Sequence, residues 1–120
     1  MEKALNKLKE LTGHKNVKMV SSGNAAIFAA MWIVREISRS KRKESRAKSK
    51  QKGNKRPLII IPDQGGWISF KNYPALLGME VKEMKTDRGL IDLDVLKKES
   101  KGADAFFVTS FAGYYAEQPM

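Results

Sequence analysis

The chain of 120 residues predicts an α/β fold with a mostly parallel sheet. Short apolar segments, of the kind found in buried strands, alternate along the chain with segments of helical spacing. This alternation is typical of parallel strands that are joined by crossover helices. The length allows one domain with a modest core, or part of a larger domain. The sequence contains no internal repeats, which excludes a repeat architecture.

The first third of the chain is expected to form a helix, a strand and a second helix. Residues 2–12 carry leucines at helical spacing and are followed by Gly13, a favourable helix stop. Residues 17–21 are expected to form a strand and residues 24–38 a helix. Because residues 25–34 carry no polar side chain, we expect this helix to be buried on all sides in a core.

The turn between this strand and helix, Ser21-Ser22-Gly23-Asn24, offers a site for phosphate. The free N–H groups of a helix's first turn and the positive end of its dipole attract anions. Gly23 would allow close approach of the backbone, and the Ser and Asn side chains can add hydrogen bonds. Ser and Asn are also the favoured helix-capping residues, and the turn alone favours an ordinary cap.

The net charge of +10 is concentrated in residues 39–56, which contain ten basic residues and one acid. The remainder of the chain is nearly neutral. Because this segment has no apolar residue larger than alanine, we expect a flexible basic insertion at the surface. The alternative is a patch that binds nucleic acid or another acidic partner, although no aromatic side chains are interleaved to stack on bases.

The second half of the chain is expected to supply three strands. Residues 58–61 form a continuous apolar run between two prolines, as in buried parallel strands. Residues 79–85 alternate at period two, and a turn follows at 86–89. Residues 105–108 are expected to form the last strand.

Two helices are expected between these strands. Residues 67–77 are predicted to be partly helical, with Pro74 near a helix start or at a kink. Asp92 is expected to cap a helix that runs to about Lys101.

The run Asp63-Gln64-Gly65-Gly66-Trp67 follows the apolar strand and is the second candidate site. In open α/β sheets, ligands bind beyond the carboxyl ends of strands. Trp67 would set an aromatic face beside the phosphate turn, although composition alone favours a packing role. Asp63 has no second carboxylate or histidine at useful spacing, and we interpret it as a turn residue. His14, the single histidine, is interpreted as a surface residue.

The composition indicates the cellular compartment in which the protein is expected. The chain contains no cysteine, which excludes disulfides and thiolate metal sites and fits a reducing compartment. It is charged from its second residue, unlike a signal peptide, and its longest apolar run of ten residues is too short to span a bilayer. We therefore expect a cytoplasmic protein with no metal site and no membrane partner.

The order of these segments resembles that of fold-type-I pyridoxal-phosphate-dependent enzymes, and in particular of the DegT-like sugar aminotransferases. The resemblance is carried by the stretches SSGNAA, LIIIPDQGGW and GLIDLDVL, and it covers nearly the whole chain outside the basic insertion. In that family a Ser-Gly-Thr-Ala-Ala turn holds the cofactor phosphate, and an aromatic residue stacks on the pyridine ring. The resemblance implies a three-layer α/β/α fold, with residues 1–120 as the N-terminal part of an incomplete aminotransferase large domain.

Matched residue by residue, the cofactor-binding turn falls on Ser22, Gly23, Asn24 and Ala25. Asn24 stands where the family usually has threonine. Trp67 falls on the ring-stacking aromatic, and Ser110 lies near a position where the family often has histidine. The chain departs from the family in its basic insertion and in Gly65-Gly66, which shifts the aromatic by about one residue.

The resemblance implies a transferase that uses pyridoxal 5′-phosphate to move an amino group from a donor to a keto substrate. It also implies a homo-oligomer in which a second subunit completes the site. Carbon–sulfur and selenium chemistry occur on the same fold, so the reaction type stays open. The family's Schiff-base lysine and its pyridine-pairing aspartate would lie beyond Met120, so no catalytic residue is expected within the chain. The alternative function is a non-catalytic nucleic-acid-binding module that uses residues 39–56.

Overall fold

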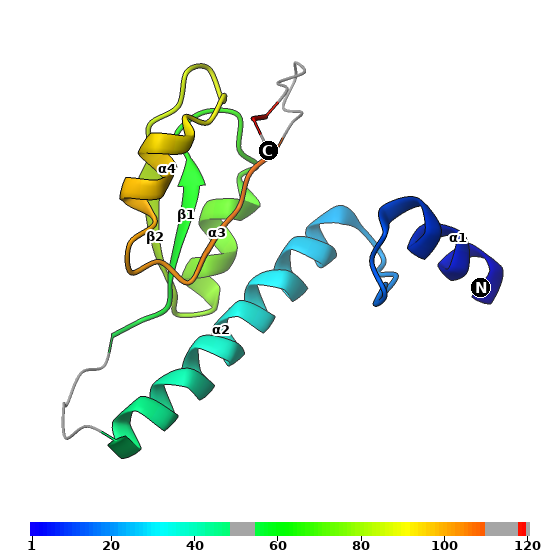
Figure 1. Ribbon diagram of the computed structural model, residues 1–120, viewed down its shortest axis with the longest axis horizontal. Coiled ribbons are helices and arrows are strands. Elements are labelled where there is room, and N and C mark those ends of the chain that lie inside the picture. The colour runs from blue at the N-terminus through cyan, green and yellow to red at the C-terminus, as the bar shows by residue number, and fades with distance from the viewer. Residues whose placement is uncertain (49–54, 110–117, 120) are drawn as a thin grey trace.

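The computed structural model describes residues 1–48, 55–109 and 118–119. These residues contain four α-helices and three β-strands: α1 (Glu2–Thr12), α2 (Gly23–Lys48), β1 (Leu58–Pro62), α3 (Ser69–Leu76), β2 (Glu80–Met84), α4 (Leu93–Glu99) and β3 (Ala105–Phe106). The strands form one all-parallel sheet in the order β2-β1-β3, so that β1 is central. Figure 1 shows β1 beside β2. The predicted α/β class with a parallel sheet is confirmed.

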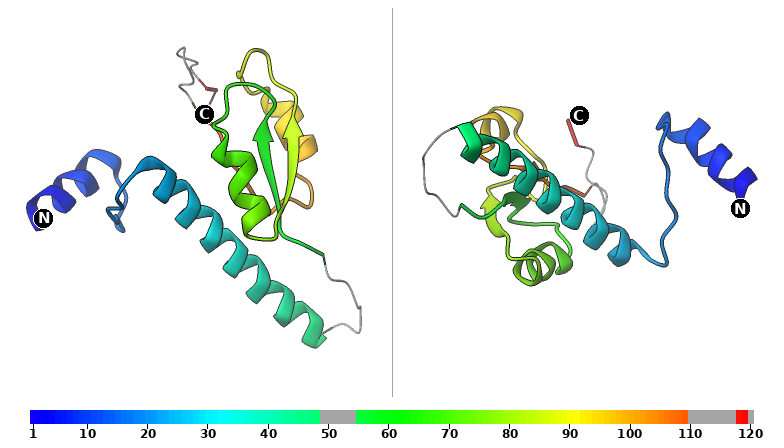
Figure 2. Two further views of the ribbon diagram at one scale, coloured as in Figure 1. Left: turned by 180° about the vertical axis from the view of Figure 1, so that it is seen from behind. Right: turned by 90° about the horizontal axis from the view of Figure 1, so that it is seen from below.

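β1 is the centre of the core because its side chains alternate between two packed faces. Ile59 and Ile61 pack with Met31 of α2 and Phe70 of α3. Ile60 points to the opposite face, where it packs with residues of β2 and α4. Figure 2 shows α3 and α4 on opposite sides of the sheet. A strand enclosed on both faces accounts for the continuous apolar run in its sequence.

The carboxyl ends of β1 and β2 are joined through Asp63. The two strands pair in register from Leu58 opposite Glu80 to Pro62 opposite Met84. The Asp63 N–H donates to the Met84 carbonyl at 2.9 Å. Its carboxylate accepts from the N–H and the hydroxyl of Thr86, at 2.9 and 2.6 Å. The prediction that Asp63 is a turn residue is therefore confirmed.

The predicted turn at 86–89 and the predicted cap at Asp92 are confirmed. Arg88 and Gly89 both have positive φ, 51° and 87°, as a tight type I′ turn requires. The Asp92 carboxylate accepts two N–H groups of the first turn of α4, at 2.8 and 3.2 Å. The helix ends at Glu99, two residues before the predicted end.

Two predicted details differ in the structure. Of the two predicted alternatives for Pro74, the position near a helix start is wrong, because Pro74 lies in the interior of α3 near its C-terminal end. The helix continues for two residues beyond Pro74, and the Pro74 carbonyl accepts from Met79 N–H at 2.8 Å at the turn into β2. The last strand, Ala105–Phe106, is also shorter than the predicted 105–108.

The predicted strand at 17–21 is wrong. These residues form no regular element and connect α1 to α2 (Figure 1). Met19 and Val20 are both about half exposed. A short apolar segment becomes a strand only where a neighbouring strand supplies hydrogen-bond partners. Both sides of β1 are already occupied by β2 and β3, and residues 17–21 pair with neither of those two outer strands.

The basic segment is helical over residues 39–48, so the prediction of a flexible insertion is wrong there, whereas residues 55–56 form no regular element. α2 continues through residues 39–48 without interruption to Lys48. Extending a formed helix avoids the cost of a new nucleus, and Lys and Arg are good helix formers. Their charges also complement the negative end of the helix dipole. Residues 49–54 lie outside the described residues.

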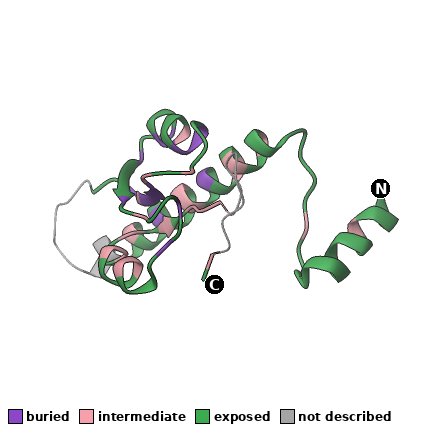
Figure 3. Ribbon diagram, turned by 90° about the horizontal axis from the view of Figure 1, so that it is seen from above, coloured by how far each residue is buried: buried purple, intermediate pink, exposed green. Residues whose placement is uncertain are grey.

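The prediction that the apolar helix is buried on all sides is also wrong. Met31 is fully buried against the sheet, but Trp32, Ile33 and Ile37 are about half exposed. α2 therefore packs along one side only, and Figure 3 shows buried positions as a minority along it. α1 has no buried residue and lies apart from the sheet (Figures 1 and 3). Within the described residues, no helix has the length and apolar character needed to cross a bilayer.

Candidate functional site

The predicted phosphate turn lies at a helix N-terminus, as expected. The Ser22 hydroxyl accepts from Ala25 N–H at 3.1 Å, and its carbonyl accepts from Ala26 N–H at 3.0 Å. Ser22 is therefore the N-cap of α2, which is the alternative that the turn alone favoured. The N–H groups of Gly23 and Asn24 have no acceptor among the described residues. These two donors remain available to an anion at the positive end of a 26-residue helix.

Gly23 is not required by the backbone at this place. Its φ lies outside the left-handed region, and a Cβ built on it would meet no atom within 4 Å. The freedom that glycine offers here would matter only to a ligand that approaches the turn closely. The residues of the turn from Ser21 to Asn24 are all exposed, and Ala25 is partly buried.

Trp67, the predicted ring-stacking residue, is presented to solvent by the loop between β1 and α3. Gly65 has φ 78°, and a Cβ on Gly66 would lie 3.2 Å from a ring carbon of Phe70. Both glycines are therefore required by the path of the chain between β1 and α3. The Trp67 side chain is 54% exposed. Trp67 therefore lies outside the buried core of the described residues.

A hollow of about 320 Å³ adjoins Trp67 at the carboxyl end of β1. Its lining combines strand-end residues with the start of α3, and includes Pro62, Asp63, Phe70 and Lys71. Ligands of open parallel sheets bind at this end of the strands. The hollow therefore has the position and the aromatic face that a planar ligand would require, whereas the ammonium group of Lys71 is paired with Glu83.

The phosphate turn and Trp67 are separate in this chain. None of residues 22–25 lines the hollow beside Trp67. The cause is the missing strand at 17–21, because without it the turn is not anchored at the edge of the sheet. The start of α2 does lie toward the end of the molecule to which β1 points (Figure 1).

The other candidates from the sequence have no described role in a site. His14 is exposed in the connection after α1, as predicted. Ser110 lies outside the described residues. Among the residues that the structure describes, no group of three or more His, Cys, Asp or Glu side chains is arranged to hold a metal ion.

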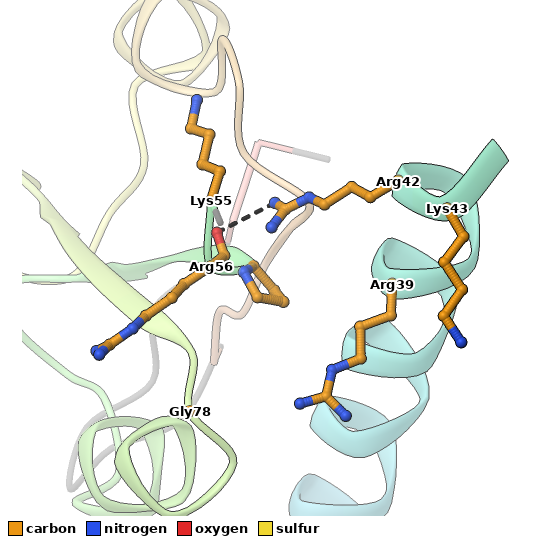
Figure 4. A pocket seen from close by; sticks show the side chains of 7 residues that line it. Arg39, Arg42, Lys43, Lys55, Arg56 and Gly78 are labelled. Atoms are coloured by element: carbon orange, nitrogen blue, oxygen red, sulfur yellow. Dashed lines mark hydrogen bonds between the residues drawn. The ribbon is translucent and has the colours of Figure 1, made fainter. Parts of the chain in front are cut away.

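A second hollow, of about 390 Å³, lies between α2 and the segment that leads into β1 (Figure 4). Its lining is dominated by cations, and it is formed by Arg39, Arg42, Lys43, Lys55, Arg56, Pro57 and Gly78. We call this second hollow, which is lined by five basic residues, the basic hollow. Sequence reasoning located the charge but missed the hollow, because it treated residues 39–48 as a loop and not as the wall that α2 supplies.

Arg42 holds the wall of this hollow in place. Its guanidinium donates to the Arg56 carbonyl at 3.1 Å and pairs with the Asp104 carboxylate at 3.5 Å. Asp104 in turn accepts from the Leu58 N–H at 2.8 Å. The pair therefore joins α2 to the amino end of β1. No local signal in a single sequence indicates this contact, because Arg42 and Asp104 are 62 positions apart.

One perturbed carboxyl group lies away from both hollows. Lys82 of β2 donates a hydrogen bond to Glu99 of α4 and forms an ion pair with it. This bond and the ammonium charge hold the pKa of Glu99 below its ordinary value. The pair joins a helix to the strand beneath it, and we interpret its role as structural.

No protein-family model matches this sequence, and no curated protein matches it.

Proposed function

We propose that residues 1–120 form the N-terminal portion of the large domain of a pyridoxal-phosphate-dependent, DegT-like aminotransferase. The proposed architecture is the three-layer α/β/α arrangement of that family. The observation that carries the proposal is the exposed ring of Trp67 beside a hollow at the carboxyl end of the central parallel strand. This is the place at which the sequence motif puts the residue that stacks on the cofactor ring.

The loop before Trp67 supports this role. Gly65 and Gly66 let the chain turn tightly over Phe70, so that the indole is directed outward and does not pack in the core. An indole presented in this way offers a flat apolar face to a planar ring, and offset stacking adds to the gain from burying that face.

The turn at Ser22–Ala25 would hold the phosphate. Its two N–H groups that have no acceptor among the described residues, together with the dipole of α2, are suited to an anion, and the space around Gly23 is open. The proposal requires residues 17–21 to join the sheet in the complete enzyme, which would anchor the turn at the sheet edge. Each half of the site fits its part of the cofactor, and this additional strand would bring the two halves together.

Bound pyridoxal phosphate would supply an electron sink for amino transfer between an amino donor and a keto substrate. The residues of this chain would bind and orient the cofactor: the turn through its N–H donors, and Trp67 through its ring. The proposed enzyme is a homo-oligomer, in which a second subunit completes the site.

Fluorescence of the two tryptophans tests the cofactor role of Trp67. The chain contains Trp32 and Trp67, so Trp32→Phe leaves the candidate residue as the single indole emitter, and Trp67→Phe leaves the control. The ligand is pyridoxine 5′-phosphate, because it carries the ring and the phosphate but no aldehyde that would label surface lysines. We expect saturable quenching in the Trp32→Phe variant and little quenching in the Trp67→Phe variant, because stacking acts on the nearby indole.

The same titration tests whether the turn at Ser22–Ala25 holds the phosphate. Once residues 17–21 join the sheet and bring the turn to the hollow, inorganic phosphate is expected to compete with the quenching, and non-phosphorylated pyridoxine is expected to quench more weakly. Equal quenching of both variants would contradict the role of Trp67. Equal quenching by pyridoxine with and without its phosphate would contradict the role of the turn.

A further inference from the structure

The basic hollow carries a concentration of charge that the proposed cofactor site does not use. α2 presents Arg39, Arg42 and Lys43 at positions i, i+3 and i+4, which lie on one side of a helix. Lys55 and Arg56 line the opposite side of the hollow, from the segment that enters β1, and Figure 4 shows their side chains directed away from α2. Two segments that are separate in sequence therefore place five cations around one concave surface.

Most of this charge is not compensated within the described residues. Arg42 pairs with Asp104 at 3.5 Å, and Arg39 approaches Glu36 at 3.8 Å. Lys43, Lys55 and Arg56 have no carboxylate partner there, and no acid lines the hollow. The negative end of the helix dipole offsets only part of this like-charge repulsion. An anionic partner would remove the remainder.

The arrangement of the side chains indicates an extended partner. In Figure 4 the cationic groups do not meet at one point: Lys55 and Arg56 point in different directions, and Arg42 points to the backbone of Arg56. A single small phosphate group could not contact all five. A polymer with regularly spaced phosphates can contact cations that are spread over a surface, and binding would release its condensed counterions.

The absence of aromatic side chains from the lining favours a duplex over a single-stranded nucleic acid as the partner. The seven residues that form the hollow include no Phe, Tyr, Trp or His on which a base could stack. Stacking on aromatic rings is a major contribution to the binding of single strands. Contacts to phosphates alone are typical of sequence-independent binding to the backbone of a duplex.

From these observations we propose that the basic hollow binds the phosphate backbone of double-stranded nucleic acid without reading its sequence. Arg39, Lys43 and Arg56 make the phosphate contacts, and Arg42 acts as a positioning residue because it joins α2 to the sheet through Asp104. The hollow lies at the amino end of β1, whereas the hollow beside Trp67 lies at its carboxyl end. The two proposals can therefore fail independently.

The test is fluorescence anisotropy with a labelled 24-base-pair duplex, measured over a series of salt concentrations. For the 120-residue chain we expect the logarithm of the binding constant to fall with the logarithm of salt, with a slope of about −3 from the three phosphate contacts. The triple variant Arg39→Gln, Lys43→Gln, Arg56→Gln removes exposed side chains and retains Arg42. We expect it to weaken binding at least roughly tenfold at 100 mM salt and to reduce the slope by about 2 to 3.

The matched control is Lys3→Gln, Lys9→Gln, Lys15→Gln, which lowers the net charge equally at exposed positions in and after α1. We expect it to leave the affinity nearly unchanged, and far-UV circular dichroism checks that both variants keep their helices. Equal weakening by the two triple variants would overturn the proposal, because it would show that net charge alone drives binding. Absence of duplex binding at 50 mM salt would overturn it as well.

Three competitors separate the proposed partner from other anions. Poly-glutamate represents an acidic protein, tripolyphosphate a small ligand, and a single strand of equal length the unpaired nucleic acid. We expect each of them to displace the labelled duplex less effectively than unlabelled duplex does. Stronger displacement by any one of them would overturn the duplex proposal in favour of that class of partner.

Discussion

The two most apolar segments of this chain, strand β1 and the first half of helix α2, have different environments. Every residue of β1 after Leu58 is buried, between helices on one face and α4 on the other. In α2 the ten residues 25–34 carry no polar side chain, and yet Trp32 and Ile33 are about half exposed. The segment with the longer apolar run is the less buried of the two.

The difference shows that the apolar composition of a segment does not by itself determine how far the segment is buried. β1 has strands on both edges and helices over both faces, so each of its side chains meets a neighbour. α2 lies at the edge of the packed layers and meets the sheet with one side, through Met31. Its other side would need a further element to cover it.

The largest effect is expected from matched isoleucine truncations in the two segments. Ile60→Ala removes a side chain that is 1% exposed in β1, whereas Ile33→Ala removes one that is 53% exposed in α2. We expect the first to lower the free energy of unfolding by about 2–5 kcal/mol, because it leaves a cavity, and the second by less than about 1 kcal/mol. Urea denaturation measures both. A similar loss at Ile33 would show that the exposed side of α2 is covered in solution.

Removal of a helix cap is expected to have an intermediate effect on the free energy of unfolding. Asp92→Ala removes two hydrogen bonds at the start of α4, which covers one face of the sheet. We expect a loss of about 1 kcal/mol in the free energy of unfolding. Ser22→Ala removes one bond at the exposed start of α2, where fraying is local, so the global loss is expected to be smaller. A larger loss for Ser22→Ala than for Asp92→Ala would contradict the view that α2 is loosely attached at its start.

The smallest effect is expected from the Glu99–Lys82 pair, which joins α4 to β2 on the packed side of the comparison. The pKa of Glu99 is lower in the folded protein than its ordinary value of 4.5. Its stabilising contribution is therefore fully present above pH 4.5 and is lost as the pH falls through the folded pKa. We expect Glu99→Gln to lower the thermal midpoint slightly at pH 7, because exposed ion pairs contribute little.

Thermal unfolding at a series of pH values measures this difference between the two proteins. The difference is expected to shrink as the pH falls below 4.5 and to shrink at pH 7 as salt is added. If the two thermal midpoints still differ at acid pH, the substitution does not act through loss of the carboxylate charge.

Local signals predicted most of the fold. Helix 2–12 with its stop at Gly13, which adopts φ 70°, depends on the sequence within that helix. The same holds for the cap at Asp92 and for the two glycines before Trp67. The helix stop and the cap were predicted and are confirmed, because hydrogen bonds or steric limits between near neighbours determine these features, whatever the rest of the chain does.

Signals that depend on partners elsewhere in the chain were interpreted wrongly. Residues 17–21 have the composition of a strand but pair with no strand in the described residues. Residues 39–48 have the composition of a loop but continue a helix that was already formed. For the candidate site, the N-terminal position of the phosphate turn followed from the sequence, whereas its separation from Trp67 did not.

The sequence by itself determined the order of helices and strands in the second half of the chain and the place of the excess charge, because periodicity and composition are local properties. Only the tertiary structure decided which apolar segment is enclosed, that Trp67 is exposed, and that Arg42 meets Asp104 to close the wall of the basic hollow. The physical reason is the same in each case. Burial and ion pairing depend on the positions of side chains far apart in sequence, and the packing of whole elements sets those positions.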